Sequence, residues 1–245
     1  MPAPSSRAYD LPTRVRTYDA DMDIMHPLRH EMLDKALEIL PFDSAEPLRA
    51  LDLGLGTGVF AQRLLEAFPR ARVVGVDGAP AMLDLARARL GELAERVEFV
   101  AADFQQLPRE ILEDKPFDVV VSSYALHHLD AEEKLSTLRA VVETLRPHGW
   151  LLNADLVVAR GPEVEQRIQE VRVEGVTHRA PSGDERFADP GSTRSYLDRL
   201  EEAEADQPLP LATDLRILQE AGIEQAEVFW KEYREALIGG PRLAA

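Results

Sequence analysis

The chain of 245 residues contains no cysteine. This excludes disulfides, thiolate catalysis and metal sites built on cysteine. Long apolar runs are also missing, since no stretch approaches the roughly 20 residues that a helix needs to span a bilayer. The opening MPAPSSRAYDLPTR has no apolar centre of the kind found in a signal peptide. We therefore expect no membrane contact and a cytoplasmic location.

Positive charge is scarce as well. The sequence has 28 Lys and Arg residues against 44 Asp and Glu residues, a formal net charge of −16. A surface this acidic repels phosphate backbones at long range, which argues against nucleic acid as a partner. Three arginines near the N-terminus are interpreted as solvated charge in a tail: Arg7, Arg14 and Arg16.

The hydrophobic content of the chain is typical of a protein that can form a hydrophobic core. Hydrophobic residues make up 45% of the chain, and the length fits one large domain or one domain with an insertion. From residue 48 to 157, short apolar segments alternate with segments of helical spacing. This alternation indicates βαβ units and a parallel sheet. We expect strands at 48–53, 71–77, 96–103, 117–126 and 149–157, and helices at 58–69, 80–93 and 131–145.

The rest of the chain completes the predicted fold. Residues 210–223 have helical spacing with Gly222 near their end, and residues 226–240 can form two short strands. We predict a Rossmann-like, doubly wound α/β fold. It has a seven-stranded, mostly parallel sheet whose last strand is antiparallel, and it carries helices on both faces.

The domain that holds this sheet spans residues 46–245, and two further segments are distinguished from the sheet itself. Residues 1–45 form an N-terminal helical segment, and residues 160–208 form an insertion. Within the insertion, the run APSGDERFADPGSTRS (180–195) is rich in Gly, Pro, Ser and Asp and is predicted to be a mobile loop. Because both segments border the ends of strands, we expect them to form a lid that reads the substrate.

The string LDLGLGTG (51–58) places glycines at every second position after a strand. Glycine lets a backbone approach a ligand closely, and ligands of open parallel sheets bind at the carboxyl ends of the strands. One candidate ligand is a dinucleotide, because GTGVFA matches G-x-G-x-x-A. Asp77 also lies 19 residues after Gly58, close to the spacing of a ribose-binding acid. The other candidate is S-adenosylmethionine.

The full string LDLGLGTG resembles motif I of class I S-adenosylmethionine-dependent methyltransferases. Four later strings resemble the following motifs in unbroken order: VVGVDGAPAMLDLAR, VEFVAADFQQLP, FDVVVSSYALHHL and LRPHGWLLNAD. The likeness covers residues 48–157. It departs from the family at Leu55, where a smaller residue is usual, and at His148, where glycine is usual. The resemblance implies S-adenosyl-L-methionine as cofactor and S-adenosyl-L-homocysteine as product.

The resemblance also implies a set of cofactor contacts. The backbone amides of Gly54 and Gly56 would take the methionine carboxylate, and Asp77 would accept from both ribose hydroxyls. Asp103 would accept from the adenine amino group. Each acid could instead be a turn residue or a helix cap, and Met82 could instead pack in the hydrophobic core. The cofactor set is Asp52, Gly54, Gly56, Gly58, Asp77, Gly78, Met82, Asp103, Phe104 and Ser122.

The acceptor would approach after the fourth expected strand, where His127 and His128 stand together. His127 is the candidate catalytic base, since histidine titrates near neutral pH; the alternative is a purely structural pair. Arg29 is interpreted as solvated charge. No metal is expected, because without cysteine a zinc site needs distant histidines and acids. The acceptor candidates are Tyr18, His26, Tyr124 and Asp155.

The sequence therefore predicts a methyltransferase that acts on a small molecule at oxygen or nitrogen. Two other functions stay open. A carboxy-S-adenosylmethionine synthase-like enzyme would share the sheet and the cofactor, and it would need a cationic residue near the methyl position. A non-catalytic protein that binds the cofactor could use the acidic helix expected at 196–206 as a partner surface.

Overall fold

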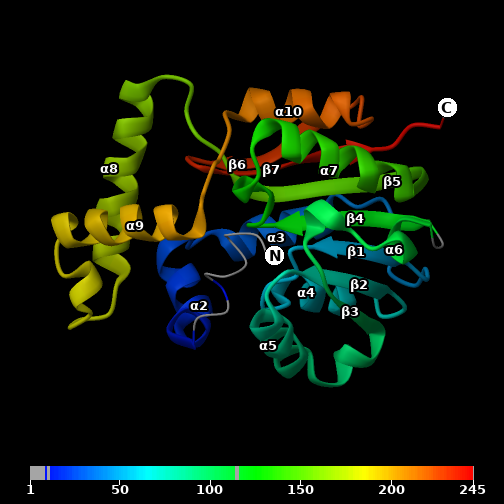
Figure 1. Ribbon diagram of the computed structural model, residues 1–245, viewed down its shortest axis with the longest axis horizontal. Coiled ribbons are helices and arrows are strands. Elements are labelled where there is room, and N and C mark those ends of the chain that lie inside the picture. Colours follow the sequence, from blue (N-terminus) through cyan, green and yellow to red (C-terminus); the bar gives the residue numbers. More distant parts are fainter. Residues whose placement is uncertain (1–8, 10–11, 114–115, 245) are drawn as a thin grey trace.

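The computed structural model describes residue 9 and residues 12–113 and 116–244. In these residues one sheet has seven strands in the order β3-β2-β1-β4-β5-β7-β6 (Figure 1). Strand β7 runs antiparallel to both of its neighbours, and the other pairings are parallel. The predicted fold is confirmed. The strands are β1 (Arg49–Leu53), β2 (Arg72–Asp77), β3 (Val97–Ala101), β4 (Phe117–Ser123), β5 (Leu145–Leu156), β6 (Glu227–Glu232) and β7 (Glu235–Pro241).

The two central strands explain why the sheet is stable. Almost every residue of β1 and β4 is buried, as expected of parallel strands covered on both faces. The longer β5 has an irregular pairing with β4 near its start, where His148 has a φ of +63°. Glycine adopts that conformation most easily, so the histidine occupies a glycine-type position at a small cost in strain.

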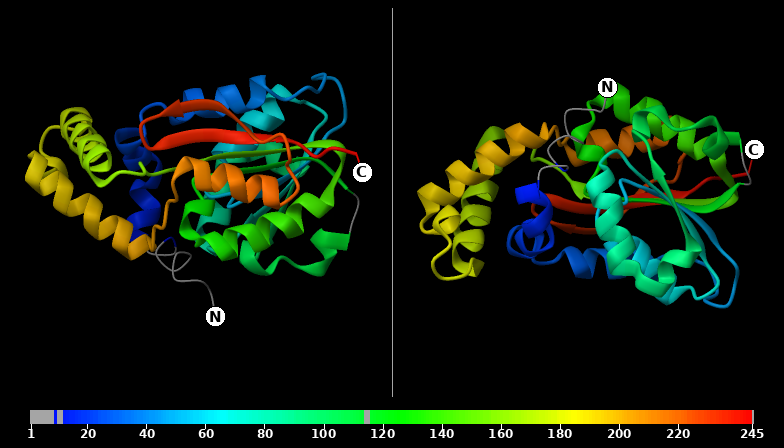
Figure 2. Two further views of the ribbon diagram at one scale, coloured as in Figure 1. Left: turned by 90° about the horizontal axis from the view of Figure 1, so that it is seen from above. Right: turned by 60° about the horizontal axis from the view of Figure 1, so that its bottom comes forward.

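Helices cover both faces of the sheet (Figure 2). One apolar core joins the sheet to α3 (Arg29–Glu38), α4 (Val59–Ala67) and α5 (Pro80–Leu90). The other core joins the opposite face to α6 (Arg109–Glu113), α7 (Ala131–Thr144) and α10 (Leu211–Glu220). Short 3-10 turns follow three elements: η1 (Gly91–Arg96), η2 (Phe104–Gln106) and η3 (Leu126–His128).

The N-terminal segment and the insertion pack on each other at one end of the sheet (Figure 1). They comprise α2 (Pro12–Met25), α8 (Pro162–Arg179), η4 (Glu185–Phe187) and α9 (Pro190–Glu204). A separate small core joins them, made of Met22, Met25, Val173, Val176, Phe187 and Leu197. No helix within the described residues combines the length and apolar character needed to cross a membrane.

Two expectations for these segments are wrong. The second half of the predicted loop 180–195 is the start of α9, where Asp189 accepts hydrogen bonds from the amides of Gly191 and Ser192. The first half is anchored as well, because Phe187 is only 2% exposed. Arg14 is not solvated either, since its Nε donates to Glu204 at 2.7 Å in a largely buried pair.

Candidate cofactor and acceptor site

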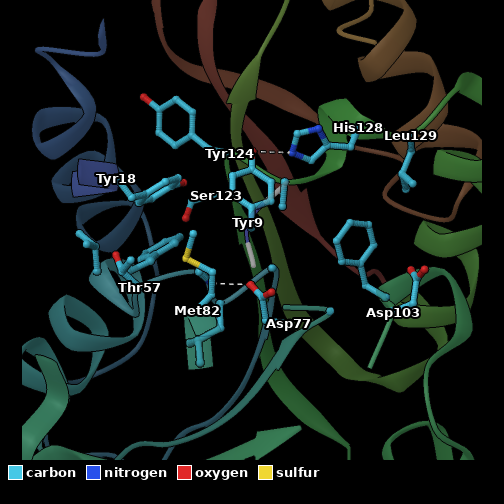
Figure 3. Close-up of a pocket in the computed structure, with 18 of the residues that line it drawn as sticks. Tyr9, Tyr18, Thr57, Asp77, Met82, Asp103, Ser123, Tyr124, His128 and Leu129 are labelled. Carbon is cyan, nitrogen blue, oxygen red and sulfur yellow. Dashed lines mark hydrogen bonds between the residues drawn. The ribbon is translucent and has the colours of Figure 1, made fainter. Parts of the chain in front are cut away.

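A cavity of about 380 Å³ lies at the carboxyl ends of β1, β2, β3 and β4 (Figure 3). This is a volume typical of small-ligand sites. The turns that follow these four strands form most of its wall. The remaining wall comes from the N-terminal segment and from the residues after α9. The polar and aromatic lining residues include Tyr9, Tyr18, Arg29, Thr57, Asp77, Asp103, Phe104, Ser123, Tyr124, His128, Glu133 and Gln207.

The glycine loop has the conformation that only glycine adopts without strain. Gly54, Gly56 and Gly58 have φ values of +76°, +54° and +78°. A Cβ atom at Gly54 would stand 2.3 Å from the Cβ of Ala125, so the loop packs tightly there. A Cβ atom at Gly56 would meet nothing closer than 3.9 Å, which leaves open space above this part of the loop.

The expected role of the loop amides is not supported. The N–H groups of Gly54 and Leu55 both donate to the Val76 carbonyl at 2.9 Å, and the Gly56 N–H donates to Asp77 Oδ2 at 2.7 Å. These donors already have partners, so a carboxylate would need another counterpart. The side chain of Leu55 occupies the space beside Gly75, where a Cβ would come within 2.7 Å of it. The unusual leucine is thus accommodated by a glycine on the neighbouring strand.

Asp77 and Asp103 stand at the cavity wall as the sequence predicts. Asp77 is fixed by the amides of Gly56 and Ala79, which donate to its two oxygens at 2.7 and 2.8 Å. A carboxylate can accept about four hydrogen bonds in all. Asp103 caps η2 by accepting from the Gln105 amide, and it lines the cavity at the same time. Gly78, Met82 and Phe104 also line the cavity.

Three predicted cofactor residues lie behind the wall instead of on it. Asp52 is 1% exposed, and neither carboxylate oxygen has a hydrogen-bond partner among the described residues. Burial, and then the charge of Asp77, raises the pKa of Asp52 to about 7. Ser122 Oγ donates to the Leu53 carbonyl, and Gly58 packs against Ala86 of α5. Asp52 and Ser122 thus lie behind the loop, and Gly58 joins the loop to the helices that cover the sheet.

Aromatic side chains also line the cavity. Tyr18, Tyr124 and His128 stand around Tyr9, and the Tyr9 ring lies above the Asp77 carboxylate in the view of Figure 3. Burial raises the pKa of each tyrosine above its ordinary value, so all three are neutral phenols near pH 7. Tyr124 has a φ of +49° and donates to Glu235 at 2.8 Å. A strained backbone of this kind is found most often at functional sites.

Two of the acceptor candidates do not reach the cavity. His26 Nδ1 lies 2.9 Å from Glu235 Oε1, and its ring lies against the ring of Tyr124. Asp155 is 2% exposed and accepts from His127. Both residues contact groups behind the wall, so their contribution to the site is to hold other side chains in place.

The two histidines have different surroundings. His127 is 3% exposed; its Nδ1 donates to Asp155 Oδ1 at 2.6 Å, and its Nε2 lies 3.4 Å from Asp206 Oδ1. Burial opposes the charged imidazole, but the two carboxylates raise the pKa of His127 to about 10. The geometry gives His127 no direct path to an acceptor. His128 is the imidazole on the cavity wall, and burial together with His127 lowers its pKa.

Sequence reasoning missed several wall residues. Arg29 is the only Lys or Arg that lines the cavity in the described part of the chain, and it is 6% exposed. Its Nε donates to Asp23 at 2.9 Å, so the interpretation as solvated charge is wrong. Tyr9, Glu133 and Gln207 also line the cavity. These positions depend on tertiary packing, and no sequence motif marks them.

Comparison with known proteins agrees with this architecture. A family model described as "Methyltransferase domain" matches residues 50–149. An uncharacterized methyltransferase of Bacillus subtilis (strain 168) is 32% identical over 164 residues, which cover 65% of this chain and 71% of the relative. Several other curated relatives are matched over only about half of their length.

Solved structures share the fold. An O-methyltransferase family protein from Burkholderia thailandensis superposes with a TM-score of 0.66 at 21% identity, over 96% of this chain and 61% of that chain. A phosphoethanolamine N-methyltransferase of Haemonchus contortus, solved with S-adenosyl-L-methionine, has a TM-score of 0.57 at 20% identity, over 81% and 38% of the two chains. With the glycine loop, the acids at successive strand ends and this strand order, the chain belongs to the class I S-adenosylmethionine-dependent methyltransferase family.

Proposed function

We propose that this protein transfers a methyl group from S-adenosyl-L-methionine to an oxygen or nitrogen atom of a small molecule. One observation supports this most strongly. The glycine loop, Asp77 and Asp103 lie at one cavity, and Tyr9, Tyr18 and Tyr124 line the same cavity. The two acids suit a nucleoside, and the aromatic rings suit a compact acceptor. The net charge of −16 weighs against nucleic acid as that acceptor.

The cavity residues fit the cofactor. Asp77, held by two amides at the end of β2, is suited to the ribose hydroxyls. Asp103 and Phe104 stand where the adenine would lie, one as acceptor and one as an apolar face. Each of the loop amides described above has only one N–H, and that N–H has a partner. The Arg29 guanidinium has five N–H donors, of which Asp23 and Asp19 bind those on Nε and Nη2. Arg29 is therefore the residue we assign to the methionine carboxylate. A charged donor makes the stronger type of hydrogen bond to such a group.

When bound, S-adenosyl-L-methionine supplies an electrophilic methyl group on its sulfonium. The chain then has to hold the acceptor in line and exclude water, and alignment alone contributes much of the rate. Neutral tyrosines suit this task, since the rings of Tyr9, Tyr18 and Tyr124 line the cavity without adding charge. The lid function of residues 1–45 and 160–208 belongs to the same proposal. It is supported by Tyr18 of α2 and by Gln207 after α9, which both line the cavity.

The proposal is tested by turnover. The protein is incubated with methyl-labelled S-adenosyl-L-methionine and a pool of small metabolites, and the products are separated by mass. Release of S-adenosyl-L-homocysteine with label in a new compound supports the proposal. A heavier, carboxylated cofactor would instead indicate the carboxy-S-adenosylmethionine synthase-like reaction. Binding without any turnover would indicate a non-catalytic partner protein. Either of these outcomes would overturn the proposal.

The assignment of Arg29 has its own test. Arg29→Met removes the charge but keeps a long side chain, and it should weaken cofactor binding at least about tenfold, the scale of one charge-assisted hydrogen bond. Arg16→Met is the control, because Arg16 is exposed on the neighbouring helix α2. Equal affinity of the two variants in calorimetry would show that another residue takes the carboxylate.

A further inference from the structure

Three side chains, of which His128 lies on the cavity wall and two lie behind it, place donor atoms around one point. His127 and His128 lie in η3 after β4, and Asp206 follows α9, 78 residues further along the chain. One donor atom of each residue lies within 4.8 Å of the other two. Asp206 Oδ1 is 3.4 Å from His127 Nε2 and 3.1 Å from His128 Nδ1. The cluster is at most 9% exposed in any of the three side chains.

These distances are those of a metal site. Zinc bonds nitrogen and oxygen at about 2.0–2.2 Å, which sets neighbouring ligands of a tetrahedron about 3.3–3.6 Å apart. The distances of 3.1 and 3.4 Å from Asp206 to the two histidines are close to that spacing. The two imidazole donors lie within 4.8 Å of each other, and a bound ion would set them at the same spacing.

The hydrogen bonds around the cluster orient its donor atoms inward. The Tyr9 hydroxyl donates to Glu204 Oε2 at 3.0 Å, so it accepts from His128 Nε2, which lies 3.2 Å away. That assignment puts the proton of His128 on Nε2 and leaves the Nδ1 lone pair facing Asp206. Neither His128 Nδ1 nor Asp206 Oδ1 has a hydrogen-bond partner among the described residues. Two buried acceptors at 3.1 Å repel each other unless a proton or a metal ion lies between them.

The other histidine has the arrangement typical of a metal ligand. The Nδ1 of His127 donates to the buried carboxylate of Asp155 at 2.6 Å. Metal-bound histidines almost always donate their second ring N–H to such a group, which fixes the tautomer and the ring orientation. Without an ion, the charged imidazole of His127 lies between the carboxylates of Asp155 and Asp206. A divalent ion would take the place of the Nε2 proton of His127 and would balance both carboxylates.

We propose that His127, His128 and Asp206 bind one divalent transition-metal ion, with zinc preferred. Imidazole nitrogen and carboxylate oxygen are common zinc ligands, and three protein donors leave one tetrahedral position for water or for an atom entering from the cavity. The ion would hold the segment after α9 against the turn after β4. It would thereby fix the wall at which His128 and Gln207 stand. The site shares no residue with the proposed cofactor contacts and does not depend on the methyl-transfer proposal.

Metal binding is measured with zinc alone, without cofactor or acceptor. Untagged protein is treated with a chelator, freed of it, and titrated with zinc chloride in a calorimeter. We expect one ion per chain with micromolar or tighter affinity. Asp206→Asn should weaken zinc binding at least about 100-fold. This exceeds the 10- to 100-fold loss typical when a group that hydrogen-bonds a metal ligand is removed. His30→Gln is the matched control, because His30 is 44% exposed and belongs to another ion pair.

The visible absorption of bound Co²⁺ gives a second measurement, which an ion bound loosely at the surface would not reproduce. Tetrahedral Co²⁺ absorbs strongly in the visible range, whereas octahedral Co²⁺ is pale, and the strong bands should vanish in Asp206→Asn. If that variant does not fold by circular dichroism, Asp155→Asn replaces it and should bind zinc about 10- to 100-fold more weakly. Equal zinc affinity in the wild type and the folded variant, or no one-to-one binding, would overturn the proposal.

Discussion

The carboxyl group of Asp52 illustrates how much a single buried residue can determine. It lies under the glycine loop at 1% exposure, without a hydrogen-bond partner among the described residues. Its pKa is raised from 3.8 to about 7 by burial and by Asp77. Between these two values the folded protein holds a proton that the unfolded chain has released. Stability therefore falls as the pH rises through this window, and it stays reduced above it.

Asp52→Asn should remove this pH dependence, because asparagine resembles the protonated acid and never ionises. The variant should be more stable than the wild type at pH 8, by up to about 4 kcal/mol at 1.36 kcal/mol per pKa unit. At pH 5 the gain should be much smaller. Urea unfolding of the ligand-free proteins at both pH values measures this. A stability difference that does not change with pH would show that Asp52 is not protonated in the folded state.

Residues at the ends of strands were the most predictable part of the site. Asp77 and Asp103 follow successive strands, so the sequence alone places them at one edge of the sheet. The loop amides were not predictable in the same way, because their acceptor, the Val76 carbonyl, lies on a different strand. Nor could the sequence distinguish His127 from His128. Both are in a short 3-10 turn, where periodicity does not indicate which ring faces the cavity.

At the scale of elements, α7 and α10 are joined by a buried ion pair. Lys134 Nζ lies 2.8 Å from Asp214 Oδ1, and both side chains are at most 3% exposed. Lys134→Met should cost about 3–5 kcal/mol of unfolding free energy, because it leaves a carboxylate buried without its partner. The double variant Lys134→Met/Asp214→Leu should recover most of this loss. Denaturant unfolding measures both variants.

An exposed pair on α10 serves as the control. Arg216 and Glu220 are 63% and 41% exposed, so Arg216→Met should change stability by no more than about 1 kcal/mol. If Lys134→Met lowers the free energy of unfolding by no more than Arg216→Met does, the buried pair does not make the larger contribution to stability that its burial predicts.

The packing of α2 on the insertion depends on another pair. Arg186 makes two hydrogen bonds of 2.9 Å to Asp21, a residue of α2 that is 1% exposed. Arg186→Met should speed hydrogen exchange in α2 about 10- to 100-fold, as expected for losing bonds worth about 1.5–3 kcal/mol. Exchange in β1 and β4 should not change, and cofactor affinity should stay within about threefold, roughly 0.65 kcal/mol.

Arg194→Met on α9 is the matched control, since Arg194 forms an exposed pair with Asp198. Faster exchange in the central strands as well would mean that α2 and the sheet open together, which contradicts a separately moving lid. The start of α9 could have been found in the sequence, because Asp189 followed by Pro190 is a helix-start signal. The abundance of Gly, Pro and Ser around it suggested a loop instead.

At the scale of the whole molecule, local patterns specify the sheet better than they specify what surrounds it. The βα alternation and the five motifs determine which strands exist and where each ends. How α2 packs on α8 and α9 is different, because it depends on Met22 meeting Phe187 and Leu197 across more than 160 residues. The cavity's aromatic part and the candidate metal cluster both arise from that packing, so no stretch of sequence contains either.

The measurement that tests this account most directly is calorimetric binding of S-adenosyl-L-methionine to the wild type and to Asp77→Ala. The account predicts micromolar affinity, no binding of nicotinamide dinucleotides, and a loss of about 1.5–3 kcal/mol in the variant. Asp84→Ala, at a residue of α5 whose side chain is 79% exposed, should bind like the wild type. Tight binding of NAD, or unchanged affinity in Asp77→Ala, would contradict the assignment of the glycine loop and Asp77 to this cofactor.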